Sequence, residues 1–181
     1  TDLEKYYPTS LLVTGFDIIF FWVARMIMMG LNFNDDVPFK DILIHGLVRD
    51  SKGRKMSKSL KNTIDPLELS EKHGADALRF SLIEKAAPGQ DVPFDEEWTI
   101  AAKKFGNKLW NAAKFVHLYS PEEKRTDEIK EITCPENVWI ASRFDEVLAE
   151  FNELFEKYKI SDAYKLIYNF VWSDLFDWYF E

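Results

Sequence analysis

Residues 51–63 form a basic loop whose residue types and spacing suit chemistry on an anion. Its basic residues are Lys52, Arg54, Lys55, Lys58 and Lys61. No residue in this range is acidic. Lys55 and Lys58 are separated by Met-Ser and flanked by small residues, so their ammonium groups can move over a bound anion. Nucleotidyl transfer needs such cations, because negative charge builds on the α-phosphate and the departing pyrophosphate. The competing interpretation is a solvated basic loop.

Three further observations sharpen this hypothesis. The loop is not a P-loop, because it lacks Gly-x-x-x-x-Gly-Lys-Ser/Thr and no helix directly follows Gly53. Residues 1–64 hold nine Lys/Arg against seven Asp/Glu, whereas residues 65–181 hold 14 against 24. The formal charge is −8 with a pI near 5.0, which argues against a module that binds nucleic acid over its whole surface.

The elements before the loop must position it. Residues 11–15 and 42–48 are apolar and rich in β-branched side chains, which predicts two buried strands. Residues 18–29 predict a helix between them, ended by Gly30 and Asn32. Strand, helix and strand predict a βαβ unit with a parallel sheet, whose ligands gather at the carboxyl ends of the strands. Those ends are residues 15–17 and 45–48.

The rest of the chain is predicted to be helical. Asp65 and Pro66 mark the start of a short helix, and another begins at Asp76. Ser161 is predicted to cap the last helix. The longer helices are predicted at residues 95–119, 138–158 and 161–181, with a charged connector at 120–137.

The fold class is therefore α/β followed by all-α. We predict half of a Rossmann-like parallel-sheet domain at residues 1–64, a short helical linking module at 65–94, and a helical bundle at 95–181.

Composition excludes several classes of protein. Apolar residues make up 46% of the chain and aromatic residues 15%, which predicts a packed core. The single cysteine, Cys134, excludes an internal disulfide and a cysteine-based zinc site. His45, His73 and His117 are widely spaced, so no metal site is predicted, and the last two are interpreted as structural. The chain is predicted to be cytoplasmic.

The apolar run at residues 18–31 needs its own explanation. It has about 14 residues and contains Arg25, which is short of the roughly 20 that cross a bilayer, so we predict a buried helix and no membrane. The chain lacks an initiator methionine and ends within an aromatic helical pattern, so we expect a fragment of a longer protein.

Residues 55–59, Lys-Met-Ser-Lys-Ser, are identical to a motif of the class I aminoacyl-tRNA synthetases. Residues 7–26, 44–50 and 107–112 also resemble this family, and in particular its valine-specific branch. The resemblance extends over nearly the whole chain. It implies that valine is activated with ATP and Mg²⁺ to an adenylate and transferred to the 3′ end of tRNA(Val). An isoleucine-specific relative is an alternative, because one methylene discriminates by only ~1–3 kcal/mol.

The resemblance also implies roles in the ATP site. Lys58 would contact the phosphates of ATP and stabilise the adenylation transition state, with Lys55 assisting. The residues implied to line the rest of the ATP site are Gly15, His45, Gly46, Met56 and Ser57. His45 has the alternative of being an ordinary, partly buried histidine.

Two residues are implied to bind the amino acid. Asp17 would receive the ammonium group of valine, and Trp22 would help to wall the aliphatic pocket. The alternatives are that Asp17 caps its helix and that Trp22 is a core residue.

The bundle is implied to be an anticodon-binding domain. The sequence supports this with one acid-free helical stretch, whose lysines are Lys103, Lys104, Lys108 and Lys114. Such lysines suit contacts to phosphates, although charged runs are usually only surface. The family's His-Ile-Gly-His motif is absent and is expected upstream, so this chain alone is predicted to be inactive. A non-catalytic tRNA-binding module derived from a synthetase is the alternative.

Overall fold

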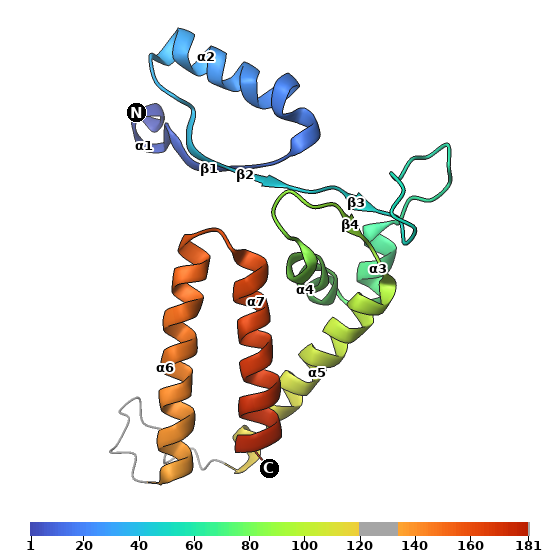
Figure 1. Ribbon diagram of the computed structural model, residues 1–181, viewed down its shortest axis with the longest axis vertical. Coiled ribbons are helices and arrows are strands. Elements are labelled where there is room, and N and C mark those ends of the chain that lie inside the picture. The colour runs from blue at the N-terminus through green and yellow to red at the C-terminus, as the bar shows by residue number, and fades with distance from the viewer. Residues whose placement is uncertain (120–133, 181) are drawn as a thin grey trace. The chain divides into compact units, whose positions relative to one another are not determined.

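The computed structural model describes residues 1–119 and 134–180, which fall into two compact units (Figure 1). The first unit comprises residues 1–64 and 86–94, and the second comprises residues 65–85 and 95–181. The segment at 65–94 therefore contributes to both units. The domain boundaries predicted above stay a prediction for the protein as a whole.

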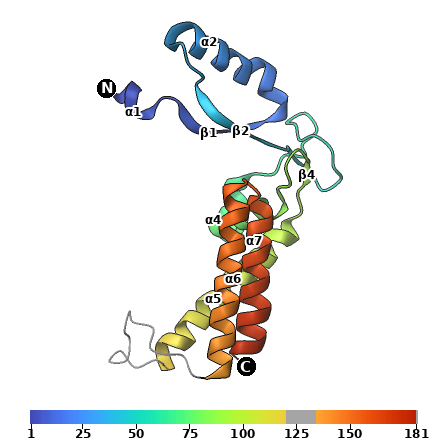
Figure 2. The same ribbon diagram turned by 60° about the vertical axis from the view of Figure 1, so that its left-hand side comes forward.

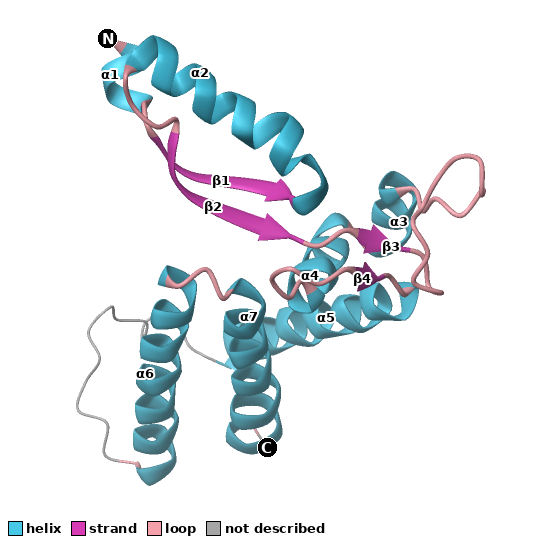
Figure 3. Ribbon diagram, turned by 45° about the horizontal axis from the view of Figure 1, so that its top comes forward, coloured by secondary structure: helices cyan, strands magenta, loops and turns pink. Residues whose placement is uncertain are grey.

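The first unit is built on two parallel strands. Its elements are α1 (Asp2–Tyr6), β1 (Thr9–Gly15), a 3-10 turn η1 (Phe16–Ile18), a π-helical segment η2 (Ile19–Val23), α2 (Ala24–Asn34) and β2 (Phe39–His45). Strand β1 pairs with β2 in parallel, with Thr9 opposite Phe39 and Gly15 opposite His45. Helix α2 runs alongside both strands (Figure 3). The predicted βαβ unit is confirmed.

Helix α2 differs from its prediction at its end. It continues to Asn34 instead of ending at Gly30 and Asn32. A Cβ on Gly30 would lie 2.6 Å from Tyr7 Oη and 2.9 Å from Pro38 Cδ. The glycine therefore serves close packing rather than termination.

The prediction that the apolar helix is buried is wrong. By length and composition the helical segment Phe16–Asn34 could cross a membrane, and only 11% of its most apolar window is buried. Val23 is buried, whereas Phe20 is 79% exposed and Met28 is 68% exposed. Two strands about 5 Å apart present a narrow face, so they cover only one stripe of the helix.

A second, smaller sheet was not predicted. It consists of β3 (Val48–Arg49) and β4 (Val92–Pro93), which pair in parallel. The predicted strand at 42–48 is divided between β2 and β3 at Gly46, where a Cβ would lie 1.8 Å from the Gln90 carbonyl oxygen. The Asp91 carboxylate accepts a hydrogen bond from the Leu47 N–H (2.8 Å) and pairs with Arg49. The Leu47 N–H, followed by the Arg49 side chain, lowers the pKa of Asp91.

The second unit is entirely helical in its described residues. Its elements are α3 (Pro66–His73), α4 (Ala75–Lys85), α5 (Glu96–Tyr119), α6 (Pro135–Glu156), α7 (Ile160–Asn169) and a π-helical segment η4 (Phe170–Tyr179). Helices α6 and α7 lie side by side and antiparallel (Figures 1 and 2). The predicted helices and fold class are confirmed, except that α6 begins at Pro135, within the stretch predicted as connector. Most of the predicted connector, at residues 120–133, lies outside the described residues.

Of the two predicted helix caps, Asp65 on α3 is confirmed and Ser161 on α7 is wrong. The Asp65 side chain accepts a hydrogen bond from the Leu67 N–H (2.8 Å) and caps α3, as predicted. Ser161 does not cap α7, because the helix begins one residue earlier and Lys159 is at the cap position. The Ser161 hydroxyl instead donates to the Glu84 carbonyl oxygen (2.6 Å) on α4.

The core of the second unit is aromatic. Phe105 on α5 packs against Tyr168 on α7 with 4.7 Å between ring centroids, and Phe80 on α4 contacts both rings. Beside them, the hydroxyls of Ser81 and Thr99 are fully buried and hydrogen-bonded to each other (3.2 Å). Tilted aromatic packing of this kind joins α4, α5 and α7.

Candidate active site

The carboxyl ends of β1 and β2 bring three of the predicted residues together. Gly15 is buried and lies opposite His45, and a Cβ on it would be 2.7 Å from Asp17 Oδ1 and 3.7 Å from His45 Cε1. His45 Nδ1 lies 2.8 Å from the Gly46 carbonyl oxygen. Since a carbonyl only accepts, Nδ1 carries the proton. Because Gly15 has no side chain, no Cβ stands between its backbone and the neighbouring Asp17 carboxylate and His45 imidazole.

Asp17 and Trp22 follow these strand ends. No hydrogen bond or ion pair reaches the Asp17 carboxylate from the described residues, and η1 has no side-chain cap, so the capping alternative has no support. Trp22 lies in η2 and is 58% exposed, so it is not a core residue of this chain. Within the described residues, no hydrogen bond or ring contact joins Trp22 to Asp17.

The basic loop leaves β3 through a tight turn. The Asp50 N–H donates to the Arg54 carbonyl oxygen (3.0 Å), and the Gly53 N–H donates to the Asp50 carbonyl oxygen (2.8 Å). Gly53 has φ +75°, in the left-handed region that favours glycine. Arg49 and Lys55 then face each other as an antiparallel bridge. This turn directs the chain into residues 55–59.

Two polar side chains that sequence reasoning missed hold the loop. Asp50 is only 6% exposed and accepts hydrogen bonds from the backbone of Lys52 and Arg54. Asn62 donates to Asp50 and accepts from the Ser57 N–H. The signal available in the sequence was position: one residue directly precedes the acid-free loop, and the other lies at its end.

The two lysines of the motif keep their ammonium groups available. Lys55 and Lys58 are exposed, and no hydrogen bond or ion pair reaches either ammonium within the described chain. Between them, Met56 and Ser57 are half-buried. The Ser57 hydroxyl lies 3.1 Å from that of Ser59. The loop therefore combines a fixed backbone with two unpaired cations. No hydrogen bond in the described residues joins it to Gly15 or Asp17.

The lysines of α5 do not form one basic patch. Lys108 forms an ion pair with Asp177 (2.9 Å) and lies 4.0 Å from the centroid of the Trp172 ring. Lys103 donates to the Lys72 carbonyl oxygen (3.2 Å). Lys104 and Lys114 are exposed. Lys108 thus contributes to helix packing, whereas no acidic side chain pairs with the other three among the described residues.

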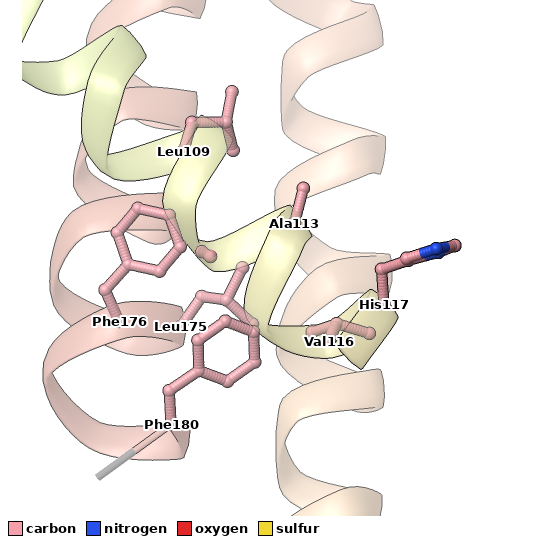
Figure 4. Close-up of a pocket in the computed structure, with 8 residues that line it drawn as sticks. Leu109, Ala113, Val116, His117, Leu175, Phe176 and Phe180 are labelled. Atoms are coloured by element: carbon pink, nitrogen blue, oxygen red, sulfur yellow. The ribbon is translucent and has the colours of Figure 1, made fainter. Parts of the chain in front are cut away.

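The second unit contains an apolar cavity of about 410 Å³ between α5 and η4 (Figure 4). Leu109, Leu175, Phe176 and Phe180 line it, and the ring of His117 points away from Phe176 and Phe180. Apart from His117, all of the side chains that line this cavity are apolar. Among the described residues, no cluster of His, Cys, Asp or Glu is arranged to hold a metal ion.

Two family models match the chain. The model of class I tRNA synthetases (I, L, M and V) matches residues 1–95, and that of the anticodon-binding domain of tRNA ligase matches residues 137–181.

Curated relatives match over 99% of the chain. The valine--tRNA ligase of Pseudothermotoga lettingae is 49% identical over 180 residues, which is 21% of its own length. Those of Aquifex aeolicus and Bacillus cereus are each 50% identical, over 16% and 20% of their lengths. The chain therefore spans about a fifth of the length of the curated relatives it matches.

Solved structures share the fold. A LeuRS from Agrobacterium radiobacter, in a ternary complex with tRNA and LeuAMS, has a TM-score of 0.77 at 22% identity, covering 93% of this chain and 23% of that one. A methionyl-tRNA synthetase from Mycobacterium tuberculosis, in complex with methionyl-adenylate, has a TM-score of 0.71 at 24% identity, covering 91% and 33%.

Proposed function

Because this chain belongs to the class I tRNA synthetases, we propose that it is part of an enzyme that activates valine with ATP and transfers it to tRNA(Val). The observation that carries the proposal is the pair of unpaired ammonium groups, Lys55 and Lys58, on a loop whose backbone is fixed. Valine as the substrate is supported by about 50% identity to valine--tRNA ligases.

The lysines act on the charge that develops during adenylation. The carboxylate of valine attacks the α-phosphorus of ATP, the bond to the bridging oxygen breaks, and pyrophosphate leaves. Lys58 contacts the phosphates and Lys55 assists, so that both stabilise the transition state more than bound ATP. Because they are not held by acidic partners, they need not break ion pairs first.

The strand ends receive the remainder of the two substrates. Gly15, His45 and Gly46 bind the adenosine, and Gly15 fits this role because its backbone is not covered by a Cβ. Met56 and Ser57 complete the ATP site from the loop. Asp17 receives the ammonium group of valine, for which its unpaired carboxylate is suited, and Trp22 walls the aliphatic pocket.

Mg²⁺ belongs to the proposal as a companion of ATP. The described residues offer no cluster of carboxylates or histidines for a protein-held ion. Mg²⁺ keeps several waters and is commonly bound through substrate phosphates, so here it would be held by the triphosphate and would neutralise part of its charge.

The helical unit is proposed to bind tRNA. Residues 137–181 match an anticodon-binding domain, and Lys103, Lys104 and Lys114 are candidates for phosphate contacts. Lys108 is a weaker candidate, because Asp177 already pairs with it. We place the whole enzyme in the cytoplasm.

The test is amino-acid-dependent exchange of pyrophosphate into ATP by the full-length protein that contains this chain. We expect exchange with valine to exceed exchange with isoleucine by about 10–200-fold in kcat/KM. The 181-residue chain alone, as the matched control, is expected to show none. Faster exchange with isoleucine, or none with any amino acid, would contradict the proposal. Salt-dependent tRNA binding without exchange would indicate a non-catalytic module.

A further inference from the structure

The strongest unexplained feature of the molecule is the hydrogen-bond network at the base of the basic loop. We propose that Asp50 and Asn62 are positioning residues that join the two ends of this loop and fix the backbone from which Lys55 and Lys58 project. This inference rests on the proposed function, because it concerns how the lysines are aimed at ATP.

Asn62 uses both ends of its amide on the motif itself. Its Oδ1 accepts from the Ser57 N–H (2.9 Å), and its Nδ2 donates to the Lys55 carbonyl oxygen (3.3 Å). These bonds hold the peptide groups on either side of Met56. Because they engage only backbone, they constrain the loop without occupying either ammonium group.

Asp50 anchors Asn62 to the turn at the other end. Its Oδ2 accepts from Asn62 Nδ2 (2.9 Å) and Arg54 Nε (2.8 Å), and its Oδ1 accepts from the N–H groups of Arg54 (2.7 Å) and Lys52 (3.1 Å). The carboxylate is buried, and a buried carboxylate is retained only when paired and hydrogen-bonded. Asn62, followed by Arg54 and Lys52, holds the pKa of Asp50 well below its usual value, so the network stays ionised at any physiological pH.

The consequence is preorganisation of a loop that would otherwise be mobile. Residues 55–61 contain two serines and three lysines, and Leu60 is exposed, so little apolar packing fixes them. The bonds at the base replace that packing. Because the loop backbone is fixed before ATP binds, its conformational entropy need not be lost on the way to the transition state.

The experiment uses the full-length protein with four variants. Asn62→Ala removes the hydrogen bond between Asn62 and Asp50. Asp50→Asn and Asn62→Asp each break this bond, because two donors or two acceptors then face each other. The double variant D50N/N62D restores one bond, in which residue 50 donates and residue 62 accepts. Thr63→Ala is the matched control, because Thr63 is exposed and has no described side-chain hydrogen bond.

Two readouts are needed. Trypsin cleavage within residues 52–61 reports loop order independently of activity, since the loop holds five basic residues. We expect about tenfold faster cleavage for the single variants, partial recovery in the double variant, and no change for Thr63→Ala. In pyrophosphate exchange we expect kcat to fall about 10–100-fold with KM for valine unchanged, and to recover partly in the double variant.

The outcomes separate the two proposals. Unchanged loop cleavage in Asn62→Ala would overturn the positioning role. Faster cleavage with an unchanged kcat, in an active wild type, would overturn it as well. A wild type without exchange would refute the proposed function, and loop cleavage alone would then decide whether Asp50 and Asn62 join the loop.

Discussion

The lysines of the basic loop and those of α5 are the same residue type in opposite situations. Lys55 and Lys58 have no described partner, although the backbone around them is held by Asn62. Lys108 on α5 has its ammonium paired with Asp177 and placed over an aromatic ring. The comparison teaches that lysines differ in whether a neighbour already pairs with them, and the unpaired ones are the better candidates for binding an external anion.

The difference follows from how each region satisfies its polar groups. In the loop, the Asn62 amide and the buried Asp50 carboxylate bind backbone groups and each other. The one carboxylate at the base of the loop is therefore already hydrogen-bonded and does not pair with Lys55 or Lys58. Residues 65–181 hold 24 acidic residues against 14 basic ones, so a helical lysine there readily finds a carboxylate.

The largest effect should come from removing a loop lysine. In the full-length protein, Lys58→Ala is expected to lower the rate of valyl-adenylate formation about 10²–10³-fold, because one transition-state donor is lost. Binding of tRNA should be unchanged. Single-turnover adenylation and filter binding would measure the two effects. An equal loss of rate in Lys108→Ala would erase the distinction between the two regions.

A smaller effect is expected from the helical lysine, and on stability instead. Lys108→Ala removes a half-exposed ion pair and a cation–π contact, which together stabilise the packing of α5 on η4 by about 1 kcal/mol. The amides of α5 and η4 that exchange through local opening should exchange hydrogen about fivefold faster in the variant than in wild type. Lys104→Ala is the control, since Lys104 is exposed, and it should leave exchange unchanged.

The smallest effect concerns one carboxylate on α5, that of Glu96. Hydrogen bonds from His73 (2.8 Å), followed by Lys72 (2.5 Å), lower the pKa of Glu96 below its ordinary 4.5. Its contribution to stability is therefore present above pH 4.5 and is lost as the pH falls through the lowered value.

Glu96→Gln should accordingly lower the urea midpoint slightly at neutral pH and converge with wild type in acid. Because Glu96 is partly exposed, the shift should be small. A difference that grows as the pH falls would contradict the assignment. Glu97→Gln, on the same turn of α5, is the matched control.

Much of the fold was predictable because it follows local periodicity. The pattern of apolar residues predicted the parallel pair β1–β2 and the helices, and the Asp65-Pro66 pair predicted the start of α3. The resemblance to class I synthetases, seen in residues 55–59, is confirmed by the family match over residues 1–95.

The misses share a physical cause, which is dependence on distant contacts. Strands of two residues such as β3 and β4 have no periodicity to detect, and Gly30 was interpreted as a helix end because its contact with Tyr7 is long-range. The roles of Asp50 and Asn62 depend on a hydrogen bond between two residues that are twelve positions apart in the sequence, and no local pattern predicts that contact. The assigned roles of Gly15, Asp17 and the lysines stay predictions.

The pairing of β3 with β4 has a practical consequence for anyone who divides this polypeptide. A boundary placed after Ile64 looks natural, yet it would discard Asp91 and strip the Leu47 amide and the Arg49 side chain of their acceptor. The strand that leads into the basic loop would then have an open edge. Expression boundaries should therefore run through Phe94 or beyond, even when only the first unit is wanted.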